Sequence, residues 1–498
     1  MRLRLPLFAR LLCVTVCLVL AGVGQARTVV PAASAGGGTS APVVATALPA
    51  EVEAALARAR LPREALSAFV VEVPPGSRAA VPRLAHRAQE PVNPASVMKL
   101  VTTYAALDLL GPAYTWNTPV YIEGTVQGGS LQGNVYLQGQ GDPKLVVERL
   151  WLLLRRLQAQ GIQVIVGDIV LDKSAFQVSE LDPGRFDGEP LRPYNAAPEA
   201  LLLNYKSVLM TFIPDTAAGV ARVQYEPPLA GVHRPATVPL AAPGADCGDW
   251  RSGLKAELAD AQRVVFQGVY PAACGERSWP VAYADPRSYA ARAVEGLWRE
   301  LGGKLTGSVR EGRVPAGLKP AFAVQSPSLA ELVRDINKFS NNVMTQQLFL
   351  TLALQRQGVG SFDGARELVH QWWQARWPAE EPPVVDNGAG LSREARITPQ
   401  ALARMLQSAW VSPVMPELLA SLPVAGVDGT LRRSQSRPGS AHLKTGSLRD
   451  VMSIAGYVHA ASGRRYVLVG IVQHAQAGNA RPVLDALIDW TARDGAAP

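Results

Sequence analysis

Three short motifs, far apart in this 498-residue chain, constrain its fold more than any other feature. They are Ser96-Val-Met-Lys99, Ser340-Asn-Asn342 and Lys444-Thr-Gly446. Each motif alone is equally typical of an ordinary helix cap or of a lysine exposed to solvent. Their order and the local structure around each predict instead that they meet in one site. The fold must then bridge the long stretch between the first and second motifs.

The first motif lies at the start of a predicted helix. Pro94 suits a first helical turn, and Gly111-Pro112 ends the helix. The spacing puts Ser96 and Lys99 on one face of that helix. A serine needs a base before it acts as a nucleophile, and a lysine whose pKa is lowered by burial and by cationic neighbours can serve.

The second motif falls between two predicted helices, 329–339 and 343–355. Ser340 is expected to relay a proton to a leaving amine. Asn342 is expected to orient Lys99 and to hold the substrate backbone. A plain helix-capping cluster is the alternative, because Ser and Asn favour such joints.

The third motif lies on a predicted strand, 441–446. Lys444 supplies a positive charge that supports Ser340 and attracts a carboxylate. Gly446 removes a side chain where a ligand must come close. An edge-strand lysine followed by a turn is the alternative.

The first 26 residues have the form of a cleavable signal peptide. Arginines precede an apolar run from Leu11 to Val23, and Gly24-Gln25-Ala26 offers small residues before a cleavage point. The run is shorter than the about 20 residues that span a bilayer. We therefore predict export to the periplasm, no transmembrane segment in the mature chain, and a flexible spacer over 27–48.

The composition narrows the possible partners. Hydrophobic residues make up 48% of the chain and charged residues 18%, as in folded proteins. The formal net charge is +8, but we find no basic run with interleaved aromatics, so no nucleic-acid partner is expected. Cys247 and Cys274 remain after the signal peptide and predict one disulfide, with two buried thiols as the alternative. They lack the clustered partners of a zinc site, and no metal or cofactor is expected.

The pattern of elements predicts an α+β fold with an insertion. Helices and an antiparallel sheet come from both chain ends, 49–118 and 325–498, and would form the catalytic domain. Residues 119–324 are rich in strands and turns, and we expect them to form inserted domains, two of them nested.

The three motifs in this order resemble those of the penicillin-binding proteins and serine β-lactamases. The long first gap is similar to that of the D-alanyl-D-alanine carboxypeptidase/endopeptidase family, the low-molecular-mass class C penicillin-binding proteins. Further segments that agree are 136–143, 167–172, 194–198 and 423–431. The resemblance spans roughly residues 50–490. It implies a penicillin-binding core, an antiparallel sheet flanked by helices plus a helical subdomain, that carries a large β-rich insertion.

The resemblance also implies catalytic roles. Ser96 would be the acylated nucleophile and Lys99 its base. Ser340 and Lys444 would transfer protons, and Asn342 would position substrate. Backbone N–H groups of Ser96 and Ser447 would form the oxyanion hole.

Substrate binding is expected from Thr445, Gly446, Ser447 and Glu189. Glu189, with Asp187 as second choice, would bind the side-chain amine of diaminopimelate. The sequence departs from the family pattern at two places. Ser447 replaces a usual threonine, and residues 387–392 read Asn-Gly-Ala-Gly-Leu-Ser where Asp-Gly-Ser-Gly-Leu-Ser is common.

The implied function is a periplasmic serine DD-peptidase. Its partners would be peptidoglycan stem peptides, cleaved at D-Ala-D-Ala or at D-Ala–diaminopimelate cross-links, and the β-lactams that acylate it. One alternative is a serine β-lactamase. Another is a non-catalytic cell-wall-binding protein that keeps a relic site.

Overall fold

A computed structural model describes residues 47–73, 81–179 and 181–494. The predicted signal peptide and nearly all of the predicted spacer lie outside these residues. Within them, no helix is both long enough and apolar enough to cross a bilayer.

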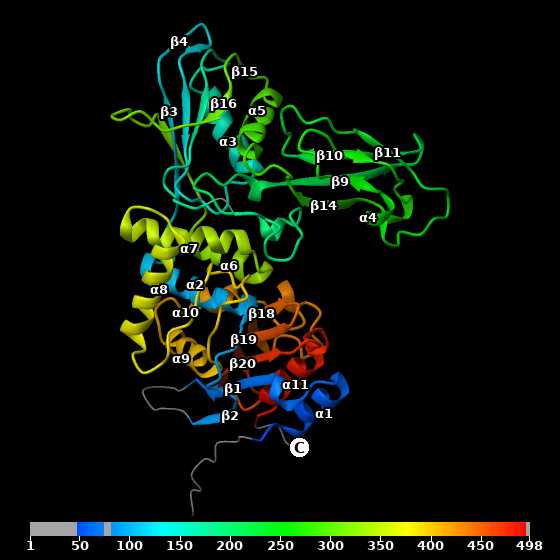
Figure 1. Cartoon of the computed structure of the whole chain (residues 1–498), viewed down its shortest axis with the longest axis vertical. Coiled ribbons are helices and arrows are strands. Elements are labelled where there is room, and N and C mark those ends of the chain that lie inside the picture. Colours follow the sequence, from blue (N-terminus) through cyan, green and yellow to red (C-terminus); the bar gives the residue numbers. More distant parts are fainter. Residues whose placement is uncertain (1–46, 74–80, 180, 495–498) are drawn as a thin grey trace, which may run out of the picture. The chain divides into compact units, whose positions relative to one another are not determined.

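The central feature is an antiparallel sheet of five strands built from both ends of the chain. The order is β18-β19-β20-β1-β2. Both faces are covered, so β19 and β20 are buried along almost their whole length. One face packs on α1 and α11, which lie side by side (Figure 1). These elements are β1 (Leu66–Glu72), β2 (Pro82–His86), β18 (Ala441–Leu448), β19 (Val451–His459), β20 (Arg465–Gln473), α1 (Ala50–Ala59) and α11 (Arg481–Ala492).

The other face of the sheet packs against a cluster of helices. Its centre is α2, which is buried all round from Lys99 to Leu107 and so behaves as a core helix rather than a surface one. The helices of this layer are α2 (Lys99–Leu110), α6 (Leu329–Phe339), α7 (Asn342–Gln357), α8 (Phe362–Arg376), α9 (Pro399–Trp410) and α10 (Met415–Ser421).

The residues between α2 and α6 form further sheets with their own hydrophobic cores. Two mixed sheets, β16-β8-β6-β3-β17 and β15-β7-β5-β4, pack with α3 and α5, and a separate antiparallel sheet has the order β11-β10-β9-β14 (Figure 1). The helices are α3 (Val147–Gln158), α4 (Trp250–Gly253) and α5 (Tyr289–Glu300). The strands are β3 (Asn117–Ile122), β4 (Thr125–Gln127), β5 (Ser130–Gln132), β6 (Val135–Gln138), β7 (Val164–Ile165), β8 (Ile169–Asp172), β9 (Ser207–Asp215), β10 (Val220–Glu226), β11 (Thr237–Pro239), β12 (Ala256–Glu257), β13 (Val265–Phe266), β14 (Arg277–Ala282), β15 (Lys304–Leu305), β16 (Val309–Glu311) and β17 (Phe322–Gln325).

The chain enters and leaves this β-rich region at neighbouring points. The first strand, β3, pairs with the last, β17, so that Asn117 lies opposite Gln325. Next to this pair, Trp116 N donates to Ser326 Oγ at 2.9 Å and Ser326 N donates to Trp116 O at 2.8 Å. Cys247 and Cys274, within the region, are joined by a disulfide.

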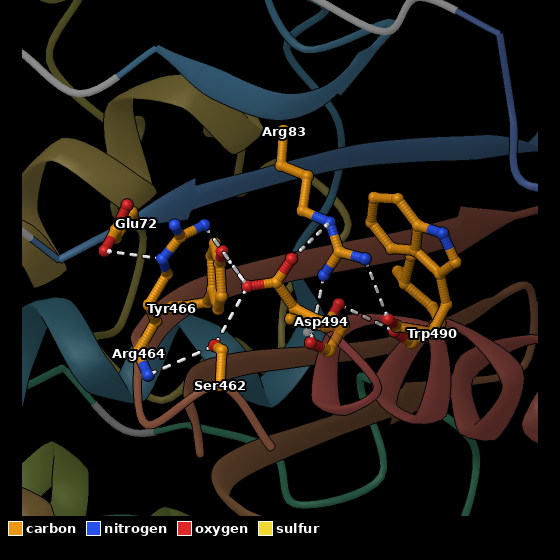
Figure 2. A network of polar contacts seen from close by, with 9 residues as sticks. Glu72, Arg83, Ser462, Arg464, Tyr466, Trp490 and Asp494 are labelled. Atoms are coloured by element: carbon orange, nitrogen blue, oxygen red, sulfur yellow. Dashed lines mark hydrogen bonds and ion pairs between the residues drawn. The ribbon is translucent and has the colours of Figure 1, made fainter. Parts of the chain in front are cut away.

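A polar network, here called the C-terminal corner, ties α11 to the edge of the central sheet (Figure 2). Arg83 on β2 donates to the carbonyl oxygens of Trp490 and Thr491 at 3.2 and 3.0 Å and stacks 3.9 Å from the Trp490 ring centroid. Asp494 accepts from Tyr466 at 2.7 Å and from Ser462 at 3.0 Å. The corner comprises Glu72, Arg83, Ser462, Arg464, Tyr466, Trp490, Thr491 and Asp494.

The predicted α+β class is confirmed. The division into 49–118, 119–324 and 325–498 stays a prediction.

Candidate active site

Ser96 lies in a tight turn that leads directly into α2. The prediction placed it in the first helical turn; the structure makes residues 95–98 a 3₁₀ turn, and the α-helix begins at Lys99. Ala95 has a left-handed φ of 48°, an unusual conformation for a residue with a side chain. Asn93 holds it there, accepting from Ala95 N at 2.9 Å and donating to Ser392 O at 2.9 Å. The nucleophile candidate is thus fixed by a strained and well-supported backbone.

Lys99 is fully buried, and it connects the first two motifs. Its Nζ donates to Asn342 Oδ1 and to Ala389 O, both at 2.6 Å, and lies 3.0 Å from Ser96 Oγ. Burial, and then the nearby charge of Lys444, hold the pKa of Lys99 well below its usual value. A neutral amine has two N–H groups and one lone pair. The two acceptors use both N–H groups, so the lone pair is left for the Ser96 hydroxyl.

The second motif meets the third. Ser340 ends α6 in a left-handed conformation with a φ of 57°, and Asn341 caps α7 by accepting from Met344 N at 3.0 Å. The capping alternative therefore applies to Asn341, the middle residue. Lys444 donates to Ser340 Oγ at 2.8 Å and to Thr445 O at 2.6 Å. We call Ser96, Lys99, Ser340, Asn342 and Lys444 the motif cluster.

Lys444 is as deeply buried as Lys99. Desolvation lowers its pKa to about 7. Lys444 donates to a hydroxyl and to a carbonyl, and among the described residues no carboxylate is hydrogen-bonded to it that would offset the desolvation. The motif cluster therefore holds two buried amines, and burial lowers the pKa of both.

Gly446 lets β18 touch the serine turn. A Cβ atom at this position would lie 2.3 Å from Ser453 Oγ, 2.7 Å from Pro94 O and 2.9 Å from Ser96 N. Ser453 Oγ itself donates to Pro94 O at 2.7 Å. The main chain of Ser96 therefore faces the main chain of β18, as a shared oxyanion hole with Ser447 requires; that role stays a prediction.

Sequence reasoning missed the contribution of the 387–392 loop, whose function it left open. The loop supplies the Ala389 carbonyl to Lys99, and Thr102 Oγ1 donates to Gly388 O at 2.8 Å. Gly390 has a φ of 72°, and a Cβ there would lie 1.9 Å from Ala95 O. The glycine-rich pattern signalled a close backbone approach. A backbone carbonyl that accepts a hydrogen bond can belong to any residue type, so the sequence does not reveal it.

Glu189 stands apart from the motif cluster. Its side chain is 56% exposed and lies 3.4 Å from Arg192 Nε. Asp187 is better connected, because it accepts from Tyr194 OH at 2.9 Å and from Asn195 Nδ2 at 2.8 Å. Although burial acts to raise the pKa of Asp187, these hydrogen bonds lower it. Asn342 Nδ2 reaches the same segment through Tyr194 O at 3.3 Å.

Two cavities adjoin the Asp187–Asn195 segment. One of about 570 Å³ includes Asn195 and Arg393 in its lining, together with residues of the 387–392 loop. The other, of about 1100 Å³, includes Glu189 and Tyr194. Both contain carboxylates and guanidinium groups. Among the described residues, no cluster of three or more His, Cys, Asp and Glu is placed to hold a metal ion.

The fold is that of a penicillin-binding protein. Penicillin-binding protein 4 from Haemophilus influenzae matches with a TM-score of 0.69 and 22% identity, covering 88% of this chain and 98% of that chain. A predatory peptidoglycan endopeptidase from Bdellovibrio bacteriovorus matches with a TM-score of 0.51 and 16% identity, covering 87% and 93%.

The family follows from the sequence. The profile of the D-Ala-D-Ala carboxypeptidase 3 (S13) family matches residues 48–494, and the chain belongs to that family. A D-alanyl-D-alanine carboxypeptidase of Actinomadura sp. (strain R39) is 27% identical over 78% of this chain and 75% of its own length. The D-alanyl-D-alanine carboxypeptidase DacB of Haemophilus influenzae is 25% identical over 77% and 81%.

Proposed function

We propose that this protein is a periplasmic serine DD-peptidase that works through an acyl-enzyme on Ser96. Its substrates are peptidoglycan stem peptides ending in D-Ala-D-Ala and the D-Ala–diaminopimelate cross-links between stems. The observation that carries the proposal is the position of Lys99, which is buried, doubly held, and 3.0 Å from Ser96 Oγ.

Acylation begins when the Lys99 lone pair takes the Ser96 proton. Ser96 Oγ then bonds to the carbonyl carbon of the penultimate D-Ala, and the N–H groups of Ser96 and Ser447 stabilise the oxyanion. Ser340, supported by the Lys444 charge, passes its hydroxyl proton to the leaving amine as the amide bond breaks, and the proton that Lys99 took from Ser96 replaces it. Water then hydrolyses the ester, which releases the shortened peptide and restores Ser96.

The side-chain amine of diaminopimelate is the recognition element that we assign to Glu189. The exposed carboxylate lines the larger cavity and can exchange Arg192 for a substrate cation. Asp187 is the second choice, because its oxygens already accept hydrogen bonds from Tyr194 and Asn195.

The predicted export of the protein supports a substrate in the cell wall. The disulfide between Cys247 and Cys274 fits an oxidising compartment. The expected β-lactam partner fits as well, because a structure of the Haemophilus influenzae protein holds a β-lactam.

Mass spectrometry after benzylpenicillin treatment tests the mechanism. We expect one covalent adduct that maps to Ser96, is missing in Ser96→Ala, and survives for minutes. Rapid turnover of the drug would support a serine β-lactamase. Absence of any adduct, with normal folding, would support a binding protein with a relic site.

Digestion of purified muropeptides tests the substrate. The wild type should remove D-Ala from monomeric pentapeptide and split cross-linked dimer, and Ser96→Ala should do neither. Cleavage of the monomer alone would remove the endopeptidase part of the proposal.

A further inference from the structure

A cavity of about 740 Å³ lies within the β-rich region, and no residue of the motif cluster lines it. Its walls come from α3, from the C-terminal end of α5, and from β10 with the segments that follow it. Cavities of about 300–1,000 Å³ are the usual size of small-molecule sites. The cavity is therefore large enough to hold a ligand, and it is separate from the candidate active site.

Two large apolar side chains of α3 line this cavity. Trp151 is 42% exposed and Leu152 is 58% exposed, whereas the other leucines of the same helix are buried. The wall also includes Tyr225 on β10, whose hydroxyl donates to Pro235 O at 2.8 Å. Adjacent apolar side chains at a surface mark binding sites more often than single ones do. The cavity thus offers aromatic surface to a ligand.

Hydrogen bonds and a close backbone contact hold two of the walls together. Arg292 on α5 donates to Ala230 O at 2.8 Å, and Ala230 N donates to Arg292 O at 3.0 Å. Gly296, one turn further along α5, packs directly on the segment after β10, because a Cβ atom there would lie 2.2 Å from Pro228 O. The cavity is therefore formed before a ligand enters, which lowers the free-energy cost of binding.

Polar groups surround the aromatic surface. Glu148, Glu226 and Glu300 line the cavity, and within residues 47–73, 81–179 and 181–494 none of them has a salt-bridge partner. Gln224 Nε2 donates to Glu226 Oε1 at 2.7 Å, and Arg234 contributes one guanidinium group to the wall. The cavity therefore carries a net negative charge and is rich in hydrogen-bond acceptors.

Charge favours one part of the peptidoglycan polymer as the occupant. The stem peptides carry free carboxylates, which the three glutamates of the wall would repel. The glycan strand consists of uncharged N-acetylated amino sugars, whose hydroxyl and amide N–H groups donate to carboxylates. The apolar C–H face of a sugar ring packs on an aromatic side chain such as Trp151, and the acetyl oxygen accepts from an amide or a guanidinium group. The cavity therefore matches the glycan rather than the stem.

We propose that this cavity binds a short stretch of the N-acetylated amino-sugar strand of peptidoglycan, with Trp151 as the residue on which a sugar ring stacks. The active site takes the stem peptide, so the two sites would engage different parts of the same polymer. Binding of the strand raises the effective concentration of stems near Ser96. The effect on cleavage rests on the proposed peptidase function, whereas the binding of glycan does not.

The binding test uses chitotetraose, an uncharged chain of N-acetylglucosamine, and protein labelled with 5-fluorotryptophan. The fluorine resonance that is missing from the spectrum of Trp151→Ala belongs to Trp151, and we expect chitotetraose to shift it in the wild type. Ligand-observed NMR then gives the affinity. Trp151→Ala should raise Kd by about 3–10-fold, as for loss of an aromatic contact, and Trp151→Phe should raise it less because a ring remains.

The cleavage test compares intact sacculi with a soluble pentapeptide that carries no sugar. The rate on sacculi relative to the rate on pentapeptide should fall by about 3–10-fold in Trp151→Ala, because only the polymer engages both sites. Ile213→Ala is the control: Ile213 on β9 is 38% exposed and does not line the cavity. It should leave both the ratio and the Kd for chitotetraose at the wild-type values.

Failure of chitotetraose to shift the Trp151 resonance overturns the proposal, as does an equal change of the ratio in Ile213→Ala. Self-association of the wild type that is lost in Trp151→Ala, measured by sedimentation, would make a second copy of the chain the occupant and would also overturn it. A wild type that cleaves neither substrate and takes no penicillin on Ser96 refutes the proposed peptidase function. In that case a shift of the Trp151 resonance would still establish the glycan site.

Discussion

The motif cluster and the C-terminal corner are both dense polar networks, but they treat their charges in opposite ways. At the corner, Arg83 and Arg464 lie against the carboxylate of Asp494, and the network stays partly in contact with water (Figure 2). In the motif cluster, Lys99 and Lys444 are fully buried and donate to hydroxyl, amide and carbonyl oxygens.

The difference distinguishes a network of paired charges from the network that we propose to be reactive. Opposite charges at the corner stabilise each other's charged forms, and the pKa of Asp494 is lowered by hydrogen bonds although burial opposes this. Two buried amines without a carboxylate destabilise each other's charged forms, which yields a basic lone pair at neutral pH. Perturbed groups of this kind gather at functional sites.

Replacing Lys99 gives the largest expected effect. Lys99→Met keeps the volume and removes the base, so acylation by benzylpenicillin should slow by about 10³–10⁴-fold. Because burying an amine opposes folding, the unfolding temperature should stay equal or rise. The measurements are adduct formation by mass spectrometry and thermal unfolding. A variant that still acylates at a wild-type rate would show that another group is the base.

The pH dependence of acylation comes next in size. The rate should rise with pH as Lys99 becomes neutral, and fall above about 7 as Lys444 loses its charge. The profile is a bell whose two limbs belong to the coupled pair. In Lys444→Arg the alkaline limb should disappear below pH 10, since arginine keeps its charge there. An unchanged alkaline limb in this variant contradicts the role given to Lys444.

Disrupting the C-terminal corner should lower the stability of the protein and leave its activity unchanged. Asp494→Asn weakens contacts with Tyr466, Ser462 and Arg464, and we expect unfolding to become easier by about 1–2 kcal/mol. The folded pKa of Asp494 is depressed, so its contribution is complete above about pH 4 and is lost as pH falls through the folded pKa. Chemical denaturation at pH 7 and pH 3 measures both effects. The acylation rate serves as the control and should not change.

The smallest effect is expected at Glu189, which is paired with Arg192 at the surface and stands apart from the motif cluster. Glu189→Gln should raise KM about 2–5-fold for stems with diaminopimelate and leave stems with a neutral side chain unchanged, as for loss of one partly exposed charge contact. Asp187→Asn is the comparison variant. A larger selective loss in Asp187→Asn would move the recognition role to Asp187.

Much of the fold was predictable because its signals are local. The strands β18, β19 and β20 end at turns, and α6 has the predicted bounds, Leu329–Phe339. The helices α8, α9 and α10 were not predicted, because they carry no chemical motif. In the structure α9 packs on the central sheet, α8 on α7 and α10 on α6. The edge strand β2 was missed too, since its place is set by pairing with β1.

The candidate site likewise combines features that the sequence predicts with features that it does not. The meeting of Ser96, Lys99, Ser340, Asn342 and Lys444 follows from side-chain types that recur in a fixed order. The Ala389 carbonyl and the left-handed Ala95 are backbone features, so only tertiary structure reveals them.

The pairing of β3 with β17 holds together the two points where the chain enters and leaves the β-rich region. Because Asn117 on β3 pairs with Gln325 on β17, the two ends of the long segment between the first two motifs lie next to each other. We call this pair of strands the seam. A folded unit that holds its own ends together adds little closure entropy to the body around it. The seam therefore keeps the two points of attachment together, so the length of the chain between them adds little to the entropy cost of forming the sheet and helices on either side.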